Sequence, residues 1–518
     1  MTQRTKGLIE QLLTLRVNSH PDDIWLKFKE NSLTWKDALS GSYQFANGLI
    51  DLGVRPNDRV AIMMGNCPEF LLSYFAISII GANPVPVNIS QRGVTLAHIL
   101  TDSSATTAIV ENDLKDAVLQ VQESTPHLKN VIVKDSDKDR KTVDLGTFFN
   151  FSSNEPIIEV EEIPEGVGMM YTSGTTGPPK GVVSMKSSAN ILGPLLQAMD
   201  VKPSETLYTP LPLFHGNALF VSVLGSIVLD AKLGLGQKFS ASRFWDEVRE
   251  FEAVEFNTLG GMISILLKQP PSPKDREHNV RVVLSAGCPA DRWEEFENRF
   301  GVKIVEWFGM VDAPGALINT EGRVGSMGKP VAGCEFKLRD QNDNDLGPNQ
   351  IGELCFRNPE GQATYYNNNP EATEQAYRGG WFHTGDLAET DEDGFYYYRG
   401  RKKESIRRLG ENISAWEIET VVNSHPSVLE SAAHAVESEL GEDEVKLVVV
   451  LREDEVIEPT EILNFCEGKM AKYAIPRYVE FVDTLPKTDT HRVQYATLKQ
   501  RGITDNTFDK VAKRSETV

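Results

Sequence analysis

The residues with the clearest chemical potential form one run, from Tyr171 to Gly181, which reads YTSGTTGPPKG. Its glycines let the backbone turn tightly and expose N–H groups, while its hydroxyls and Lys180 can bind phosphate oxygens. Apolar residues stand on both sides, so we expect a loop between two strands. The spacing from Gly177 to Lys180 does not fit the G-x-x-x-x-G-K-S/T nucleotide loop. A flexible polar turn is the alternative, but the composition of the whole run favours a phosphate-binding loop. Its predicted phosphate contacts are Thr172, Ser173, Gly174, Thr175, Thr176, Gly177 and Lys180.

Four single residues elsewhere also have the right chemistry for a nucleotide or acid site. Asp386 follows a strand-like run and a glycine, so its carboxylate can accept hydrogen bonds from two ribose hydroxyls; a surface aspartate in a turn is the alternative. Arg401 opens a basic cluster and can donate to a ribose or a phosphate, or simply face solvent. Phe308 can stack on an adenine ring or belong to the core. His215 can line a pocket or be a hydrogen-bonded core histidine.

The elements that must position these residues follow an alternation of strands and helices. Between residues 58 and 318, apolar runs of strand length alternate with helical patterns, which is typical of parallel sheets covered by helices. Residues 328–399 contain glycines and short alternating runs, which favour a twisted antiparallel sheet or barrel. A basic cluster then leads into a small α/β pattern. We predict an α/β fold with a large N-terminal domain (1–400) of parallel α/β sheets plus a small β-barrel-like part, and a smaller, mobile C-terminal α+β domain (401–518).

The composition limits the partners that this chain can have. Acidic residues outnumber basic ones by 74 to 53, and the net charge of -21 would repel a nucleic-acid backbone, although ATP can still bind a pocket with a few local cations. The five cysteines have neither metal-ligand spacing nor a dense disulfide pattern, which favours a reducing cytoplasm. We see no export signal, and the two most apolar stretches, 70–80 and 218–229, are too short to cross a bilayer, so we expect core helices there. A monomer and a homodimer are equally compatible with the sequence.

Six motifs occur in the order found in the adenylate-forming superfamily, which includes acyl-CoA synthetases, peptide-synthetase adenylation domains and beetle luciferases. The chain resembles this family from about Thr34 to Leu498, and the run from Tyr171 to Gly181 resembles its phosphate loop. The other similar segments are LPLFHG (211–216), SAGCP (285–289), WFGMVD (307–312), WFHTGD (381–386) and RKKESIRRLGEN (401–412). Residues 266–281 are similar to a stretch of carnitine- and crotonobetaine-CoA ligases and of fatty-acid-transport-type synthetases.

The resemblance implies a reaction in two steps. A carboxylate attacks the α-phosphorus of ATP in the presence of Mg²⁺ and pyrophosphate leaves, and the thiol of coenzyme A then takes the acyl group and releases AMP. In the family, the smaller domain rotates about a hinge between the steps. The implied catalytic residues are Thr172, Lys180, His215 and Arg492. The implied contacts to nucleotide and coenzyme A are, besides the phosphate loop, Gly287, Cys288, Pro289, Trp307, Phe308, Gly309, Met310, Asp386, Arg401, the hinge residue Lys403 and Gly410, and the implied metal ligand is Asp312.

Two motifs depart from the family pattern. Where the family has aromatic-Gly-x-Thr-Glu, Val311 lacks the hydroxyl and Asp312 is shorter than glutamate. Where the family has Leu-Pro-Lys-Thr-x-Thr-Gly-Lys, His491 replaces the glycine and Arg492 replaces the catalytic lysine. Arginine keeps the charge, but its planar fork has a different reach. We therefore expect slower adenylation than in a lysine-bearing relative, with thiol transfer little affected; Lys487 is a weaker candidate for the missing lysine.

Three functions are compatible with the sequence. The first is an acid–CoA ligase, and the second is an enzyme that loads the phosphopantetheine arm of a carrier protein. The third is a nucleotide-binding relative that has lost turnover, which the changes at Val311, Asp312 and Arg492 motivate. The acid is not evident from the sequence, although residues 257–262, with their glycines, are expected near the floor of its pocket.

Overall fold

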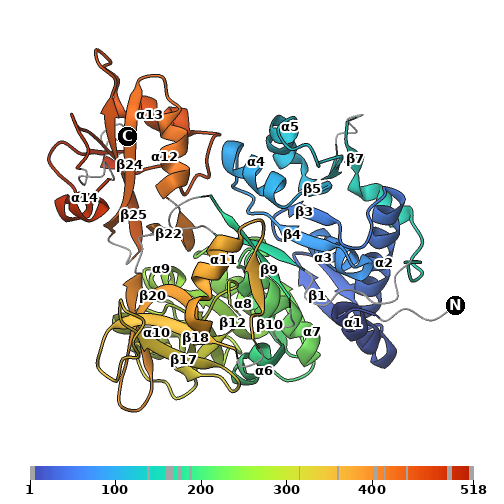
Figure 1. The fold of residues 1–518 in the computed structure, drawn as a ribbon. Coiled ribbons are helices and arrows are strands. Elements are labelled where there is room, and N and C mark those ends of the chain that lie inside the picture. The colour runs from blue at the N-terminus through green and yellow to red at the C-terminus, as the bar shows by residue number, and fades with distance from the viewer. Residues whose placement is uncertain are drawn as a thin grey trace. The chain divides into compact units, whose positions relative to one another are not determined.

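The chain forms two compact units (Figure 1). The first contains residues 1–89, 100–171 and 181–400, and the second contains residues 90–99, 172–180 and 401–518. Within these units, the computed structural model describes residues 6–136, 141–158, 168–172, 178–185, 189–313, 315–358, 361–401, 406–413, 415–438, 442–486 and 493–512. Among these residues, no helix combines the length and the apolar composition needed to cross a membrane.

A parallel sheet of five strands forms the N-terminal part of the first unit, in the order β4-β3-β5-β6-β7. Its strands are β3 (Arg59–Met63), β4 (Asn83–Pro86), β5 (Thr107–Glu111), β6 (Asn130–Lys134) and β7 (Val143–Asp144). Helix α3 (Pro68–Ile80) is buried from residue 70 to its end and packs against α2 (Trp35–Asp51). A helix that is apolar all round belongs in a core, so the core helix predicted at 70–80 is confirmed.

The second sheet of this unit has nine strands, in the order β16-β15-β14-β13-β12-β10-β11-β1-β2. They are β1 (Ile24–Phe28), β2 (Asn31–Thr34), β10 (Thr206–Thr209), β11 (Lys232–Leu235), β12 (Ala253–Leu259), β13 (Val282–Ala286), β14 (Lys303–Gly309), β15 (Ala316–Asn319) and β16 (Lys329–Pro330). The neighbours from β1 to β14 are parallel, whereas β2, β15 and β16 run antiparallel to their neighbours. The loops that follow β10, β12, β13 and β14 therefore leave the sheet at one edge, its carboxyl edge.

The two faces of the nine-stranded sheet are covered by different layers. On one face the buried side chains are Tyr208, Phe256, Val283 and Ile304. On the other face they are Leu207, Val282, Leu284 and Val305. Helix α6 (Ala189–Ala198) and the π-helix η3 (Asn217–Leu224), which continues as α7 (Gly225–Leu229), cover this second face, which we call the α6 face. The helix predicted at 218–229 is thus confirmed.

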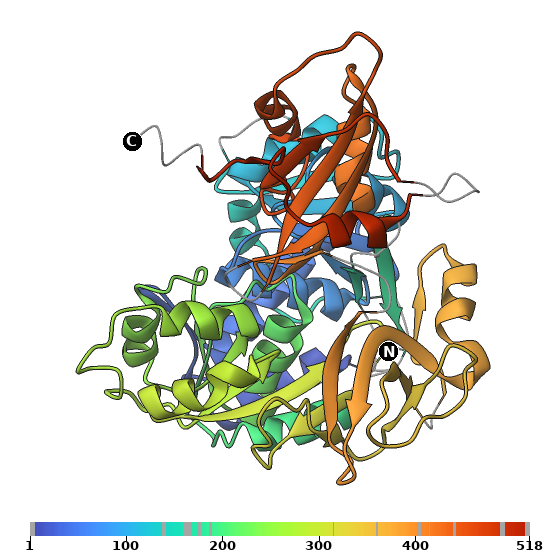
Figure 2. The same cartoon turned by 90° about the vertical axis from the view of Figure 1, so that its left-hand side faces the viewer.

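Two smaller sheets complete the first unit. One has three strands in the order β19 (Thr364–Tyr366), β9 (Lys180–Ser184) and β8 (Met169–Thr172). The other has four strands, yellow to orange in Figure 2, in the order β17 (Glu335–Arg339), β18 (Gly352–Arg357), β20 (Phe382–Thr390) and β21 (Tyr396–Arg401). The remaining helices before residue 400 are α1 (Leu8–Ser19), α4 (Gly93–Asp102), η1 (Asn112–Leu114), α5 (Lys115–Gln122), η2 (Leu145–Asn150), α8 (Phe244–Glu250), α9 (Gly260–Leu267), α10 (Ala290–Phe300), α11 (Pro370–Ala376) and η4 (Arg378–Gly380).

The second unit is built on a sheet of four strands, in the order β24 (Val428–Glu437), β25 (Asp443–Leu451), β26 (Tyr478–Phe481) and β27 (Phe508–Asp509). A separate hairpin joins β22 (Ile406–Arg408) to β23 (Glu411–Ile413), and the helices are α12 (Ala415–Asn423), α13 (Pro459–Cys466) and α14 (Tyr495–Arg501). Aliphatic side chains from these elements form a core of their own. The predicted α/β fold class, with a large N-terminal part rich in parallel strands and a smaller C-terminal part, is confirmed.

A buried carboxyl in the second unit predicts a pH-dependent stability. Glu417 of α12 is 4% exposed, and burial together with the charge of Glu411 raises its pKa from 4.5 to about 7. Between these two values the folded protein keeps a proton that the unfolded chain releases, so stability falls as the pH rises. We expect this carboxyl to lower the free energy of unfolding progressively between pH 4.5 and 7, by at most roughly 3 kcal/mol.

The measurement is urea unfolding of the full chain at a series of pH values, for the wild type and for Glu417→Gln. The glutamine variant should lose less stability than the wild type between the acidic and the neutral end of the series, because glutamine has no proton to release. Glu453→Gln, which removes an exposed carboxyl of the same unit, should behave like the wild type. Parallel curves for the wild type and Glu417→Gln would contradict the raised pKa.

Candidate functional site

The turn after β13 is held by a buried carboxylate. At Gly287 the backbone adopts a φ of 88°, and the chain continues through Cys288 and Pro289 into α10. Glu306 of β14 is paired in parallel register with Ser285, and its buried carboxylate accepts the backbone N–H groups of Gly287 and of Cys288, the latter at 3.1 Å. Two charge-assisted hydrogen bonds fix the backbone of this turn. The sequence does not reveal this role, because only the register between β13 and β14 brings Glu306 to the turn.

The first residue of α9 approaches the same turn very closely. A Cβ atom built on Gly260 would lie 2.0 Å from the carbonyl oxygen of Gly287 and 2.9 Å from its carbonyl carbon. Both contacts are with backbone, which cannot swing aside as a flexible side chain can. Only glycine therefore fits at this position, and the segment that begins α9 lies directly against the turn that is predicted to contact the nucleotide.

The LPLFHG motif (211–216), which contains His215, lies against the WFGMVD motif (307–312) at the end of β14. A Cβ atom on Gly216 would lie 2.8 Å from Cγ1 of Val311, so the absence of a side chain at Gly216 leaves the space that Val311 fills. The side chain of His215 is half-buried. Two residues after His215, Asn217 accepts a hydrogen bond on its side-chain oxygen from the amide nitrogen of Asn257, on β12. Three segments that are far apart in the chain thus meet at the carboxyl edge of the nine-stranded sheet.

Asp312 belongs to a group of polar side chains between the end of β14 and β19. The hydroxyl of Tyr366 donates a hydrogen bond to Oδ1 of Asp312 at 2.8 Å, and the hydroxyl of Thr364 donates to the Asp312 backbone carbonyl. Burial and the charge of Asp312 raise the pKa of Tyr366 well above its ordinary value, so its hydroxyl stays a donor. Carboxylate oxygens are the ligands that Mg²⁺ prefers, so the carboxylate of Asp312 is a suitable ligand for this ion.

An open pocket of about 850 Å³ lies beside this group, bordered by β19 and α11. Tyr366 and Tyr377 are among its lining residues, and the hydroxyl of Tyr377 lies 2.7 Å from that of Thr364. Spacing along the chain does not predict these partners of Asp312, because β19 belongs to a different sheet from β14.

Asp386 is placed by a bulge in β20. The pairing of β18 with β20 shifts between Glu353, which faces Leu387, and Cys355, which faces His383. Gly385, inside this irregular stretch, has a φ of 75°, which glycine adopts at little cost. The backbone N–H of Asp386 donates to the hydroxyl of Thr384 at 3.0 Å, and Asp386 itself is 2% exposed. Bulges of this kind re-aim a side chain next to a functional site.

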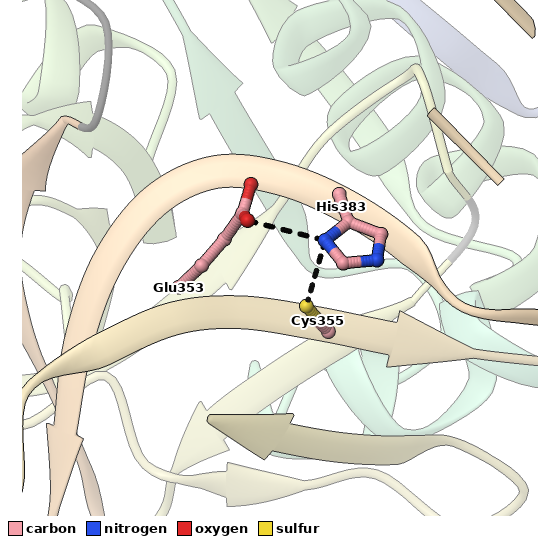
Figure 3. Close-up of side chains that lie close together, drawn as sticks. All are labelled: Glu353, Cys355 and His383. Carbon is pink, nitrogen blue, oxygen red and sulfur yellow. Dashed lines mark hydrogen bonds and ion pairs between the residues drawn. The ribbon is translucent and has the colours of Figure 1, made fainter. Parts of the chain in front are cut away.

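A buried cluster of three side chains precedes Asp386 on the same sheet (Figure 3). Nδ1 of His383 lies 3.1 Å from Oε2 of Glu353 and 3.3 Å from Sγ of Cys355. Arg378 donates to the same Glu353 oxygen at 3.0 Å. A carboxylate that is paired with an arginine is ionised and can only accept, so Nδ1 is the protonated nitrogen of the His383 ring.

The same three side chains offer atoms of the types that bind transition metals, all within 4.8 Å of one another. However, the Arg378 cation already neutralises the Glu353 carboxylate. The carboxylate and the Cys355 sulfur both lie against the same nitrogen of the His383 ring, Nδ1. Burial also raises the pKa of Cys355 to about 12, so its sulfur stays a thiol. This is the pattern of a hydrogen-bond network, which anchors the strand that leads to Asp386.

Several predicted site residues lie at the limits of the described residues or beyond them. Thr172 ends β8 and Lys180 begins β9, so the two predicted strands on either side of this run are confirmed. In the hairpin of β22 and β23, Leu409 and Gly410 occupy the turn with φ values of 54° and 78°, a conformation typical of two-residue turns. Arg401 ends β21. Outside the described residues are Ser173, Gly174, Thr175, Thr176, Gly177, Lys403, Lys487, His491 and Arg492.

Two family models match this chain. One, described as AMP-binding enzyme, matches residues 13–366, and the other, described as AMP-binding enzyme C-terminal domain, matches residues 417–492. Among curated proteins, a crotonobetaine/carnitine–CoA ligase from Escherichia fergusonii is 30% identical over 468 residues, which cover 88% of this chain and 90% of that protein. The ligase of the same description from Salmonella typhimurium is 28% identical over 471 residues, with the same coverage.

Two solved structures have a similar fold. A double mutant of o-succinylbenzoate CoA synthetase from Bacillus subtilis, bound to a product analogue, is 24% identical and has a TM-score of 0.80, with 95% of this chain and 98% of that chain covered. An amide bond synthetase from Marinactinospora thermotolerans is 20% identical and has a TM-score of 0.81, with 95% and 99% covered. At this level of identity the likeness concerns the fold.

Proposed function

Because this chain belongs to the AMP-binding enzyme family, we propose that it is an AMP-forming acid–thiol ligase, which activates a carboxylic acid with ATP and Mg²⁺ and passes the acyl group to coenzyme A. One observation supports this most directly. The His215, Gly287 and Asn257 segments meet at the carboxyl edge of a parallel sheet, and Gly216 lies against Val311. In open α/β sheets this edge is where ligands bind.

In this proposal, different predicted residues bind the adenine, the ribose and the phosphates of ATP. The turn after β13 and the stretch from the end of β14 to Met310 contact adenine, with the backbone of the turn oriented by Glu306. Asp386 accepts hydrogen bonds from the ribose, helped by Arg401. The loop from Thr172 to Lys180 binds the departing pyrophosphate. The adenine contacts are Gly287, Cys288, Pro289, Trp307, Phe308, Gly309 and Met310.

The chemistry of the first step is the attack of the acid on the α-phosphorus of ATP, which needs positive groups near the phosphates. Mg²⁺ bound with ATP supplies charge neutralisation there, and Asp312 is the residue of this chain that would hold it. Lys180 and Arg492 bring the protein's own positive charge to the phosphates and to the carboxylate. His215 lines the acyl pocket at the carboxyl edge.

For the second step we propose a two-domain arrangement, with residues 1–400 as the adenylation domain and residues 401–518 as a mobile domain that rotates about Lys403. Gly410 then lines the channel for the thiol arm. A reducing cytoplasm suits the five cysteines, none of which forms a disulfide. Coenzyme A is the proposed acceptor, and the alternative is the phosphopantetheine arm of a carrier protein.

The test of this function is acid-dependent exchange of labelled pyrophosphate into ATP, run with a panel of aliphatic, aromatic and betaine-type acids. The relatives from Escherichia fergusonii and Salmonella typhimurium are crotonobetaine/carnitine–CoA ligases, so these two acids belong in the panel. Exchange with at least one acid, followed by AMP release on addition of coenzyme A, is the expected result. The complete absence of exchange would mean that the protein binds nucleotide without turnover. Transfer of the acyl group only to a carrier protein would mean that the acceptor is the carrier protein and not coenzyme A.

Asp386→Asn should raise the KM for ATP. The substitution keeps the size of the side chain but removes the charge from a carboxylate that accepts two ribose hydroxyls, and hydrogen bonds to charged groups contribute about 1.5 to 3 kcal/mol. We expect an increase of roughly 10- to 100-fold in the KM for ATP, measured by initial rates of pyrophosphate exchange. Glu392→Gln, which removes an exposed carboxyl next to the same sheet, should leave this KM unchanged. An unaltered KM in Asp386→Asn would remove Asp386 from the ribose site.

A further inference from the structure

A buried asparagine beside the five-stranded sheet holds the loop that leads to His215. Asn66 follows β3 and is 5% exposed. Its Nδ2 donates to the backbone carbonyls of Leu211 and Gly236, each at 2.9 Å, and its Oδ1 accepts the backbone N–H of Leu213 at 2.9 Å. The side-chain amide thus uses both of its donor hydrogens and its oxygen. All three bonds go to backbone that follows β10 or β11, at the carboxyl edge of the nine-stranded sheet.

The loop between β10 and η3 depends on these bonds, because it passes through the core between two regular elements. Its two prolines have no N–H group to donate. The side chains of Leu211 and Leu213 are 4% and 0% exposed, and the hydrogen bonds from Asn66 to their backbone are buried. Buried backbone N–H and carbonyl groups are costly unless they are paired. Asn66 supplies this pairing for both leucines.

The backbone on either side of Asn66 is itself fixed. The N–H of Gly65 donates to the carboxylate of Glu111, the last residue of β5. On the other side, Cys67 is the N-cap residue of α3, and Pro68 occupies the first turn of that helix. Proline is suited to this position, because its fixed φ matches the helix. Asn66 therefore stands between the end of a strand and the start of a buried helix, which makes its side chain a firm anchor.

The far end of the same loop is held by the nine-stranded sheet. Asn217, which begins η3, accepts its hydrogen bond from Asn257 on β12. Within the loop, the backbone N–H of His215 donates to the carbonyl of Pro212 at 3.0 Å. His215 thus lies between two fixed points, one provided by each sheet. The place of its ring at the carboxyl edge depends on both.

We propose that Asn66 is a positioning residue for the activation of the acid, because it fixes the loop that carries His215 and with it one wall of the acyl pocket. The inference rests on the proposed function, since it concerns the pocket in which the acid reacts. The residues proposed to bind ATP belong to other elements. Release of the loop should therefore impair the binding and alignment of the acid and leave the binding of ATP unchanged. A displacement of about 1 Å in such a site can cost on the order of 100-fold in rate.

The test is Asn66→Ala in pyrophosphate exchange, run with the acid of the panel that the wild type uses best. The substitution removes all three hydrogen bonds to the loop and adds no charge. We expect kcat/KM for the acid to fall roughly 10- to 100-fold. The KM for ATP should stay within about threefold of the wild-type value, which is small beside the effect of losing one bond to a charged group. Melting temperature, measured on the same preparations, reports the accompanying loss of stability.

Asn319, at the end of β15, offers a matched control. It is fully buried, its Nδ2 donates to the backbone carbonyls of Arg323 and Ser326 at 2.7 and 2.9 Å, and its Oδ1 accepts the N–H of Arg323 at 3.0 Å. Asn319→Ala therefore removes the same set of hydrogen bonds from a loop that contains none of the proposed contacts. Both variants should melt at a lower temperature than the wild type, but only Asn66→Ala should change kcat/KM for the acid.

The outcomes separate this inference from the proposed function. An unchanged kcat/KM for the acid in Asn66→Ala, an equal loss in Asn319→Ala, or an equal rise in the KM for ATP would each overturn the inference while the wild type remains active. If Asn66→Ala does not fold, Thr209→Val decides, because Oγ1 of Thr209 accepts the N–H of Leu211 in the same loop at 3.2 Å. This variant should show the same selective loss, smaller in size, and an unaltered kcat/KM would overturn the inference. Absence of exchange by the wild type with every acid would instead refute the proposed function, and the inference with it.

Discussion

Gly260→Ala is expected to lower both the thermal stability and the adenylation activity of this protein. The added methyl group would lie 2.0 Å from the carbonyl oxygen of Gly287, so either the start of α9 or the turn after β13 must move. Overpacking of this kind costs about 1 to 3 kcal/mol even where side chains can yield, and here the obstacle is backbone. Because Glu306 holds the same turn, the displacement would reach the proposed adenine site, where a shift of about 1 Å can cost on the order of 100-fold in rate.

Thermal melting and pyrophosphate exchange measure the two effects of Gly260→Ala. The matched control is Gly347→Ala, because a Cβ atom at Gly347 would meet nothing within 4 Å and the residue is exposed. The control should retain the melting temperature and the activity of the wild type. A Gly260→Ala variant that also retains both would show that the two loops have room to separate, and that their close approach is not needed for the site.

The order and type of the elements could be predicted from the sequence because they depend on local patterns. The run that reads GELCFR is strand β18 (Gly352–Arg357), and the apolar stretch at 70–80 forms the buried part of α3. Strand periodicity and helical periodicity are properties of neighbouring residues, so they can be read without knowledge of the fold. The class of fold then follows from the alternation of the two patterns.

The contacts that build the site could not be predicted in this way, because they depend on register between distant strands. Glu306 looks like a charged residue in a strand, and only its pairing with Ser285 brings its carboxylate to the turn at Gly287. The partner of Asp312, Tyr366, lies on a different sheet. These contacts between distant strands cannot be predicted from a local sequence pattern.

The structure also gives a physical context for one departure from the family pattern. Val311, which stands where the family has threonine, fills the space left by Gly216. The valine thus has a packing role against the LPLFHG motif. The side chain of Phe308 is partly buried against an apolar cluster.

The second large effect is expected at Arg492, which stands where the family motif has a lysine. Arg492→Ala removes the charge proposed to bridge the carboxylate of the acid and the α-phosphate, and the loss of one such group from a transition state costs about 100- to 1,000-fold in rate. We expect a loss of this size in acid-dependent pyrophosphate exchange. The transfer step, measured as thioester formation from a synthetic acyl-adenylate and coenzyme A, should change little, because it no longer requires attack on phosphorus.

Arg492→Lys should act in the opposite direction and raise the rate of the first step, because a lysine ammonium is a compact charge at the position where the family carries one. Pyrophosphate exchange and thioester formation, run on the same preparations, separate the two steps. Arg501→Lys is the matched control, since it makes the same exchange at an exposed position at the end of α14 and should alter neither rate. A slower first step in Arg492→Lys would mean that the planar, bidentate grip of arginine is itself adapted to this acid. A lysine variant and an alanine variant that both match the wild type would instead move the catalytic charge elsewhere, with Lys487 as the next residue to replace.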